Sequence, residues 1–221
     1  MCYNVEQRKK VSDLVDRYQL VLGQENFTAK DRITISEPMA TVVERPEGRA
    51  LEIKAFGFLP WFATDPKRMS ANAKSETVRT NGMFRQAFEQ RRCIVPSTRF
   101  FEWLGTEKGN KRLFPISLLD QEIFSLAGIY DSWKDPATGD KRHTVAILTT
   151  AANSDMQPYH TREPVILPTA DDEDLWLHPS TPLADLIPLM LPLSPGLLIP
   201  RPEMAFKPVK PGQGVDEGLF A

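Results

Sequence analysis

A cysteine at position 2 is the residue of this sequence best placed to do chemistry. Removal of the initiator methionine, expected before a small side chain, would leave Cys2 with a free α-amine beside its thiol. Their usual pKa values, about 8.5 for a thiol and about 7.7–8.0 for an α-amine, make both groups partly nucleophilic near neutral pH. An aldehyde could react first with the amine, giving a Schiff base, and then with the thiolate, closing a thiazolidine ring. Cys2 could instead be the nucleophile of an N-terminal-nucleophile hydrolase, or an ordinary residue after the start codon.

Three further polar side chains stand in patterns that suit substrate binding or proton transfer. Asn72 opens a polar stretch, residues 72–77, inside a basic part of the chain. Glu102 is a lone carboxylate in an aromatic run, and His160 lies two residues before Arg162, just ahead of an apolar run. Carboxylates and imidazoles are common general acids and bases. Taken singly, Glu102 could also be an edge-strand charge facing solvent, and His160 a surface histidine in a turn.

The formal net charge of −2 argues against a generic nucleic-acid binder, but the charges are unevenly distributed. Residues 65–112 carry six more basic than acidic side chains, and residues 163–221 carry six more acidic than basic ones. A basic middle segment can present a positive surface to phosphates. The alternative is two differently charged solvated faces.

The patterning predicts one α+β domain over residues 1–221, an antiparallel β-sheet with flanking helices. Runs of β-branched and aromatic residues separated by Gly and Pro turns are typical of short strands. Strands are expected at residues 39–43, 50–58, 93–103, 113–119, 123–130 and 143–149. Helices are expected at residues 10–22, 81–92, 170–177 and 181–186. The proline-rich segment from about residue 192 to 221 is expected to be peripheral.

Composition bears on compartment and cofactors. Two cysteines allow neither a disulfide framework nor a four-cysteine zinc site, and the three histidines lack metal-ligand spacing, so no metal or other cofactor is expected. Apolar stretches fall well short of the ~20 residues that span a bilayer, and no signal peptide is visible. The sequence therefore predicts a cytoplasmic protein, nucleoid-associated in a bacterium, that acts as a monomer away from membranes.

Six segments together resemble the SRAP (SOS response-associated peptidase) family, whose members process abasic sites in single-stranded DNA. The segments stand in the family's order and spacing from Met1 to about Leu193: Cys2, residues 56–61 (FGFLPW), 72–77 (NAKSET), 92–103 (RCIVP running into FEW), 148–153 (LTTAAN) and 160–167 (HTREPVIL). The resemblance implies a single compact mixed α/β domain around an antiparallel, barrel-like β-sheet core, and single-stranded DNA containing abasic sites as the partner. It also implies a terminal cysteine that ends as a thiazolidine crosslink to the opened abasic sugar.

The resemblance also implies roles for individual residues. Cys2 would be the nucleophile, Asn72 would hold its amine and the sugar, Glu102 would shuttle protons, and His160 would exchange a proton with the sugar oxygen. Contacts to DNA would come from a further group of side chains, namely Trp61, Lys74, Arg85, Thr150 and Arg162.

Three features depart from the family pattern. Tyr3 and Asn4 stand where Gly-Arg is common, Lys74 replaces an arginine, and Glu163 replaces a methionine. Because the four core residues remain, crosslinking with associated lyase and self-maturation activity is the leading hypothesis. A cysteine-dependent peptidase and a non-covalent single-stranded DNA-binding module remain as alternatives.

Overall fold

Five strands of the computed structural model, which describes residues 3–21, 27–105 and 111–208, close into a barrel. They follow the order β10-β4-β3-β6-β9, and pairing of β9 with β10 completes the ring. The strands are β3 (Pro38–Arg45), β4 (Gly48–Phe56), β6 (Arg92–Ser97), β9 (Phe124–Lys134) and β10 (Lys141–Ala151). Closing the ring pairs both edges of each barrel strand over part of its length, which removes most of the exposed sheet edge.

Three short strands extend this sheet. β5 (Asn72–Lys74) runs parallel to β10, and β11 (Arg162–Pro164) runs antiparallel to it. β12 (Ile166–Leu167) pairs with β9. The outer end of β10 therefore lies between β5 and β11, beyond the part that pairs with β9.

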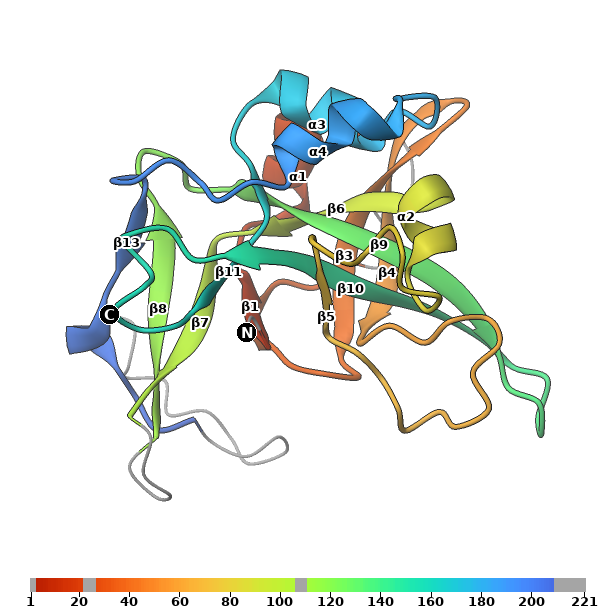
Figure 1. The fold of residues 1–221 in the computed structure, drawn as a ribbon, viewed down its shortest axis with the longest axis horizontal. Coiled ribbons are helices and arrows are strands. Elements are labelled where there is room, and N and C mark those ends of the chain that lie inside the picture. The colour runs from red at the N-terminus through yellow and green to blue at the C-terminus, as the bar shows by residue number, and fades with distance from the viewer. Residues whose placement is uncertain (1–2, 22–26, 106–110, 209–221) are drawn as a thin grey trace.

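A second, antiparallel sheet packs beside the barrel and lies to its left in Figure 1. Its strand order is β13-β8-β7-β1-β2. The strands are β1 (Asn4–Gln7), β2 (Lys30–Ile33), β7 (Arg99–Leu104), β8 (Arg112–Leu118) and β13 (Leu198–Pro200). The described part of the proline-rich segment thus supplies an edge strand, followed by the 3₁₀ turn η1 (Pro202–Met204).

Side chains of the barrel strands contribute to two hydrophobic clusters. One joins the barrel to the second sheet, with Val95 and Ile147 packed in the same cluster as Phe100 and Phe114. The other joins the barrel to the helices, which gather mostly above it in Figure 1. The helices are α1 (Val11–Tyr18), α2 (Arg85–Gln90), α3 (Ala170–Leu177) and α4 (Leu183–Leu189). Because successive side chains of a strand point to opposite faces, alternate residues of the barrel strands enter one cluster or the other.

The predicted fold class is confirmed: the chain forms one mixed α and β domain around a barrel. Most pairings are antiparallel, but β10 pairs in parallel with both β4 and β5, which was not expected. The predicted helix 10–22 ends at Tyr18, because Gln19 takes a left-handed conformation with φ 53°. The predicted helix 81–92 is helical only over Arg85–Gln90.

The prediction of one strand over residues 93–103 was wrong. The chain leaves the barrel after Ser97 and enters the second sheet at Arg99. Between them, the Thr98 backbone N–H donates to the carbonyl of Glu6 at 3.0 Å, and its hydroxyl donates to the Glu6 carboxylate at 2.6 Å. These two hydrogen bonds hold Thr98 against β1 and explain why the chain passes from the barrel into the second sheet at this residue.

Candidate active site

The β5-β10-β11 ribbon brings together three segments that carry candidate residues. Lys74 lies opposite Thr149 on one edge of β10, and Glu163 lies opposite Thr150 on the other. Asn72 is largely buried, with 9% of its surface exposed, whereas Lys74 is exposed. Thr150, predicted to contact DNA, is buried within the ribbon. Residues about 75 to 90 positions apart thus share one strip of sheet.

Arg162 is held by four hydrogen bonds within this ribbon. Its Nε donates to the Thr149 hydroxyl at 3.2 Å, and Nη2 donates to the Thr149 carbonyl at 2.5 Å. Nη1 and Nη2 also donate to the two carboxylate oxygens of Glu76, each at 2.9 Å. A guanidinium has five N–H donors, so four are already engaged. The ion pair with Arg162 lowers the pKa of Glu76.

His160 projects from the turn that leads into β11. Its Nδ1 accepts a hydrogen bond from the backbone N–H of Arg162 at 3.0 Å. A neutral imidazole whose Nδ1 is an acceptor carries its proton on Nε2. The same Nδ1 lies 3.2 Å from the Arg162 carbonyl oxygen, to which the other tautomer would donate, so the Arg162 backbone orients the ring in either tautomer.

Glu102 lies on the second sheet, with only 2% of its surface exposed. It is paired with Phe114 on β8, and directly opposite residues of antiparallel strands share a face. The Phe114 ring packs against Tyr159, with ring centroids 5.0 Å apart, and Tyr159 immediately precedes His160. Glu102 therefore faces the side of the sheet on which the His160 turn packs.

Cys2 lies outside the described residues. Asn4, two positions later, begins β1 and is paired with Phe101, the neighbour of Glu102. The other cysteine of the chain, Cys93, is buried in the core, and burial raises the pKa of its thiol to about 12. Because the thiolate is the nucleophile, Cys93 is unreactive at neutral pH.

Exposed aromatic and basic side chains lie around the start of α2. Trp61 is 61% exposed, and its indole N–H donates to the Gln86 side chain at 3.1 Å. Phe62 is 50% exposed and contacts Trp61 edge to face, with centroids 5.6 Å apart. Arg85 is exposed on the first turn of α2. Phe62 was not a candidate from the sequence, where its place in the aromatic run around Trp61 was the only signal.

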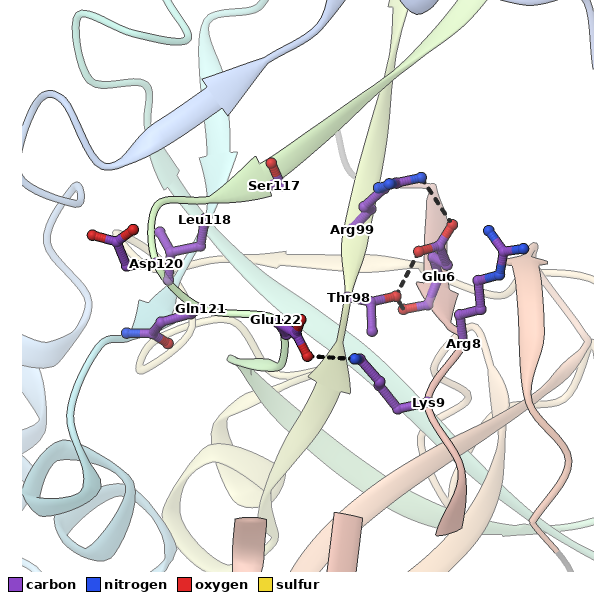
Figure 2. A pocket seen from close by; sticks show the side chains of 10 residues that line it. All are labelled: Glu6, Arg8, Lys9, Thr98, Arg99, Ser117, Leu118, Asp120, Gln121 and Glu122. Carbon is purple, nitrogen blue, oxygen red and sulfur yellow. Dashed lines mark hydrogen bonds and ion pairs between the residues drawn. The ribbon is translucent and has the colours of Figure 1, made fainter. Parts of the chain in front are cut away.

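A cavity of about 680 Å³ lies at the opposite end of the β1–β7 pair from Asn4 and is shown in Figure 2. Its charged groups are mostly paired with one another: Lys9 with Glu122 at 2.5 Å, and Arg99 with Glu6 at 3.8 Å. None of the candidate residues named above lines it. The cavity is therefore separate from the candidate site.

Among residues 3–21, 27–105 and 111–208, no group of three or more His, Cys, Asp or Glu side chains is arranged to hold a metal ion. In the same residues no helix has the length and apolar character needed to cross a membrane.

Known proteins resemble this chain over most of its length. The family described as SOS response associated peptidase (SRAP) matches residues 1–211. The abasic site processing protein YoqW of Bacillus subtilis is 28% identical over 195 residues, covering 86% of each chain. The abasic site processing protein HMCES of Xenopus tropicalis is 24% identical over 168 residues, 66% of this chain and 50% of that protein. A crystal structure of a Bacteroides thetaiotaomicron protein superimposes with a TM-score of 0.81 at 27% identity, covering 92% of this chain and 94% of the other.

Proposed function

The chain belongs to the SRAP family, and from this premise we propose that it processes abasic sites in single-stranded DNA through a thiazolidine crosslink to Cys2. The observation that carries the proposal is the convergence of strand β1 with Glu102 and the His160 turn. Asn4, two residues after Cys2 in the sequence, begins β1 opposite Phe101, the neighbour of Glu102, and this pairing supports a reaction of Cys2 with a sugar held beside Glu102.

The covalent step begins on the ring-opened abasic sugar, which carries an aldehyde at C1′. The α-amine of Cys2 adds to this carbon, and the carbinolamine loses its oxygen as water to give an imine. The thiolate then adds to the same carbon, and the nitrogen takes up a proton, which completes the thiazolidine. Glu102 donates the proton that leaves with water and accepts protons in the addition steps. One water is released overall, and no oxidant or reductant is needed.

Asn72 and His160 serve the two partners of this reaction. The Asn72 amide holds the terminal amine and the sugar by hydrogen bonds. His160, whose ring is oriented by the Arg162 backbone, gives a proton to the sugar ring oxygen as the ring opens and takes it back when the crosslink is released. Elimination of the 3′ phosphate from the imine accounts for the lyase activity. Removal of Met1, by the chain itself or by another enzyme, exposes the amine.

DNA is held by exposed cations and aromatic rings beside the ribbon. Lys74 and Arg85 contact phosphates, and Trp61 with Phe62 offers ring faces for base stacking. Arg162 faces the DNA strand, and one of the five N–H donors of its guanidinium is not used in the bonds to Glu76 and Thr149.

The experiment that tests the proposal compares the parent protein with Cys2→Ala and Cys2→Ser on a single-stranded oligonucleotide carrying one abasic site. Intact mass must first show that Met1 is absent. The parent should give a covalent band on a denaturing gel, and Cys2→Ala should give none while still binding the DNA. Cys2→Ser should give a band only after borohydride reduction of its imine. A stable band from unreduced Cys2→Ala would overturn the proposal, and binding without any crosslink by the parent would favour a DNA-binding module.

A further inference from the structure

We propose that Glu163 is a positioning residue that fixes the turn carrying His160, and so sets the rate at which the crosslink is released. The inference rests on the proposed function for its kinetic part. Glu163 is only 1% exposed and is separated from His160 by two residues. It contacts neither substrate nor reacting atoms, so any effect on the reaction must pass through His160.

The Glu163 carboxylate ties together two distant segments of backbone. Its Oε2 accepts the N–H of Asn153 at 2.8 Å, and its Oε1 accepts the N–H of Leu193 at 2.7 Å. The Asn153 side chain closes the same junction by donating to the Leu193 carbonyl at 3.1 Å. Glu163 therefore links the two ends of the turn, residues 153 and 163, to each other and to the segment before β13.

A chain of backbone hydrogen bonds leads from this junction to His160. The Asn153 carbonyl accepts the N–H of Met156 at 3.2 Å, and the Met156 carbonyl accepts the N–H of His160 at 2.9 Å. The imidazole then accepts the Arg162 N–H at 3.0 Å. The backbone N–H of Ala152 also donates to the Thr161 carbonyl at 3.1 Å, so the junction at residue 153 is one of the anchors that set the position of the ring.

A carboxylate matches the two backbone donors that this chain presents at position 163. It offers two acceptor oxygens to two backbone donors, whereas glutamine would turn an N–H₂ group toward one of them and a thioether is a weak acceptor. Burial raises the pKa of Glu163, the negative charge of Asp155 adds to this rise, and the two N–H donors oppose it. Loss of the carboxylate would leave two buried N–H groups without their acceptor and release the turn.

The first measurement uses the free protein and is independent of DNA. Long-range ¹H–¹⁵N spectra report the tautomer of each imidazole, and the chain has three histidines to assign. The parent should show His160 as a single tautomer, and Glu163→Gln and Glu163→Met should show mixed tautomers. A parent ring already averaged between tautomers would overturn the proposal, even if both variants failed to fold. A folded variant with an unchanged His160 spectrum would overturn it as well.

The second measurement follows release of the crosslink during a chase with excess competing abasic DNA. Glu163→Gln should slow release by roughly tenfold to a hundredfold, because small displacements of catalytic groups cost that much. The double variant Glu163→Gln/His160→Ala should release at the rate of His160→Ala alone, since both changes remove the same function. Glu203→Gln, at an exposed carboxylate, is the matched control and should behave as the parent. Additive effects of the two substitutions would overturn the proposal, and absence of any crosslink from the parent would contradict the proposed function instead.

Discussion

Arg162 and Glu76 form a two-pronged ion pair across the ribbon, with both nitrogen–oxygen distances at 2.9 Å. Glu76 follows β5 and is half exposed, whereas the Arg162 side chain is 16% exposed. A phosphate could take the same two donors, because guanidinium groups bind carboxylates and phosphates with the same fork. In the free protein Glu76 therefore occupies a place for which, under the proposed function, a phosphate of the DNA would compete.

Replacing Glu76 should accordingly strengthen DNA binding. Glu76→Gln removes a negative charge and frees donors of Arg162, and exposed ion pairs are worth about 0.2–1 kcal/mol. Non-covalent affinity for single-stranded DNA, measured by fluorescence anisotropy with an unreactive oligonucleotide, should rise about 1.4- to 5-fold. Glu89→Gln, an exposed carboxylate on α2, serves as the control. Weaker binding by Glu76→Gln would show that the pair braces the binding surface.

DNA affinity should fall as salt rises, because exposed cations supply the phosphate contacts. Lys74, Arg79 and Arg85 are all exposed. Each phosphate contact to a single strand contributes about −0.7 to the slope of log binding constant against log salt concentration, so three contacts give a slope near −2. Lys74→Ala should make this slope less steep by about 0.7. Lys207→Ala, in the C-terminal segment, should leave the slope unchanged. A parent slope near zero would contradict the proposed surface.

Glu102 should affect the covalent step without affecting binding. Proton transfer by a placed side chain is worth about 10²–10⁴ in rate, so Glu102→Gln should slow crosslink formation by a factor in that range. Anisotropy should show unchanged affinity, because the carboxylate is buried on the second sheet. Glu47→Gln, at an exposed position, is the control. A crosslinking rate equal to that of the parent would assign Glu102 a purely structural part.

Arg92 should matter for stability, because its buried guanidinium caps the C-terminal ends of two helices. It donates to Phe88 and Glu89 of α2 at 2.9 Å each, and to Trp176 and His178 at the end of α3 at 2.7 Å each. Cations near helix C-termini are favourable, and each unsatisfied buried acceptor costs about 1–3 kcal/mol. Arg92→Met should lower the free energy of unfolding in urea by about 3 kcal/mol or more. Arg79→Met, at an exposed site, should change it by under ~0.5 kcal/mol.

The pH dependence of stability should contain a contribution from Glu6. Burial raises the pKa of Glu6, and none of the described residues donates a hydrogen bond to its Oε2. A raised carboxyl pKa means that the folded state binds the proton more tightly, so stability falls as pH rises from the unfolded pKa through the folded one. The free energy of unfolding of Glu6→Gln, relative to that of the parent, should therefore increase as the pH rises from 4 to 7. Urea unfolding at each pH measures this difference. A constant difference between the two proteins across this range would contradict the assignment.

Much of the candidate site could be read from residue types and local pattern. Cys2 stands out by position, and Glu102 by being the lone carboxylate of an aromatic strand. Alternation predicts that Glu102 shares a face with Phe100 and Leu104, and both pack on the core cluster, whereas Trp103 is exposed. Such patterns depend on neighbours within a few residues, so they are visible without the fold. The roles assigned to these residues remain predictions.

Residue types and local patterns predict which side chains could react and where most strands and helices lie. The sheet that each strand joins and the partner that each polar group finds are set by the folded chain. The break at Thr98 depends on β1, 92 residues away, and Arg162 meets Glu76 across 86 residues. Glu163 accepts the amide of Leu193, 30 residues further on. Such pairings follow from distances in the folded chain, which local propensity and periodicity do not contain.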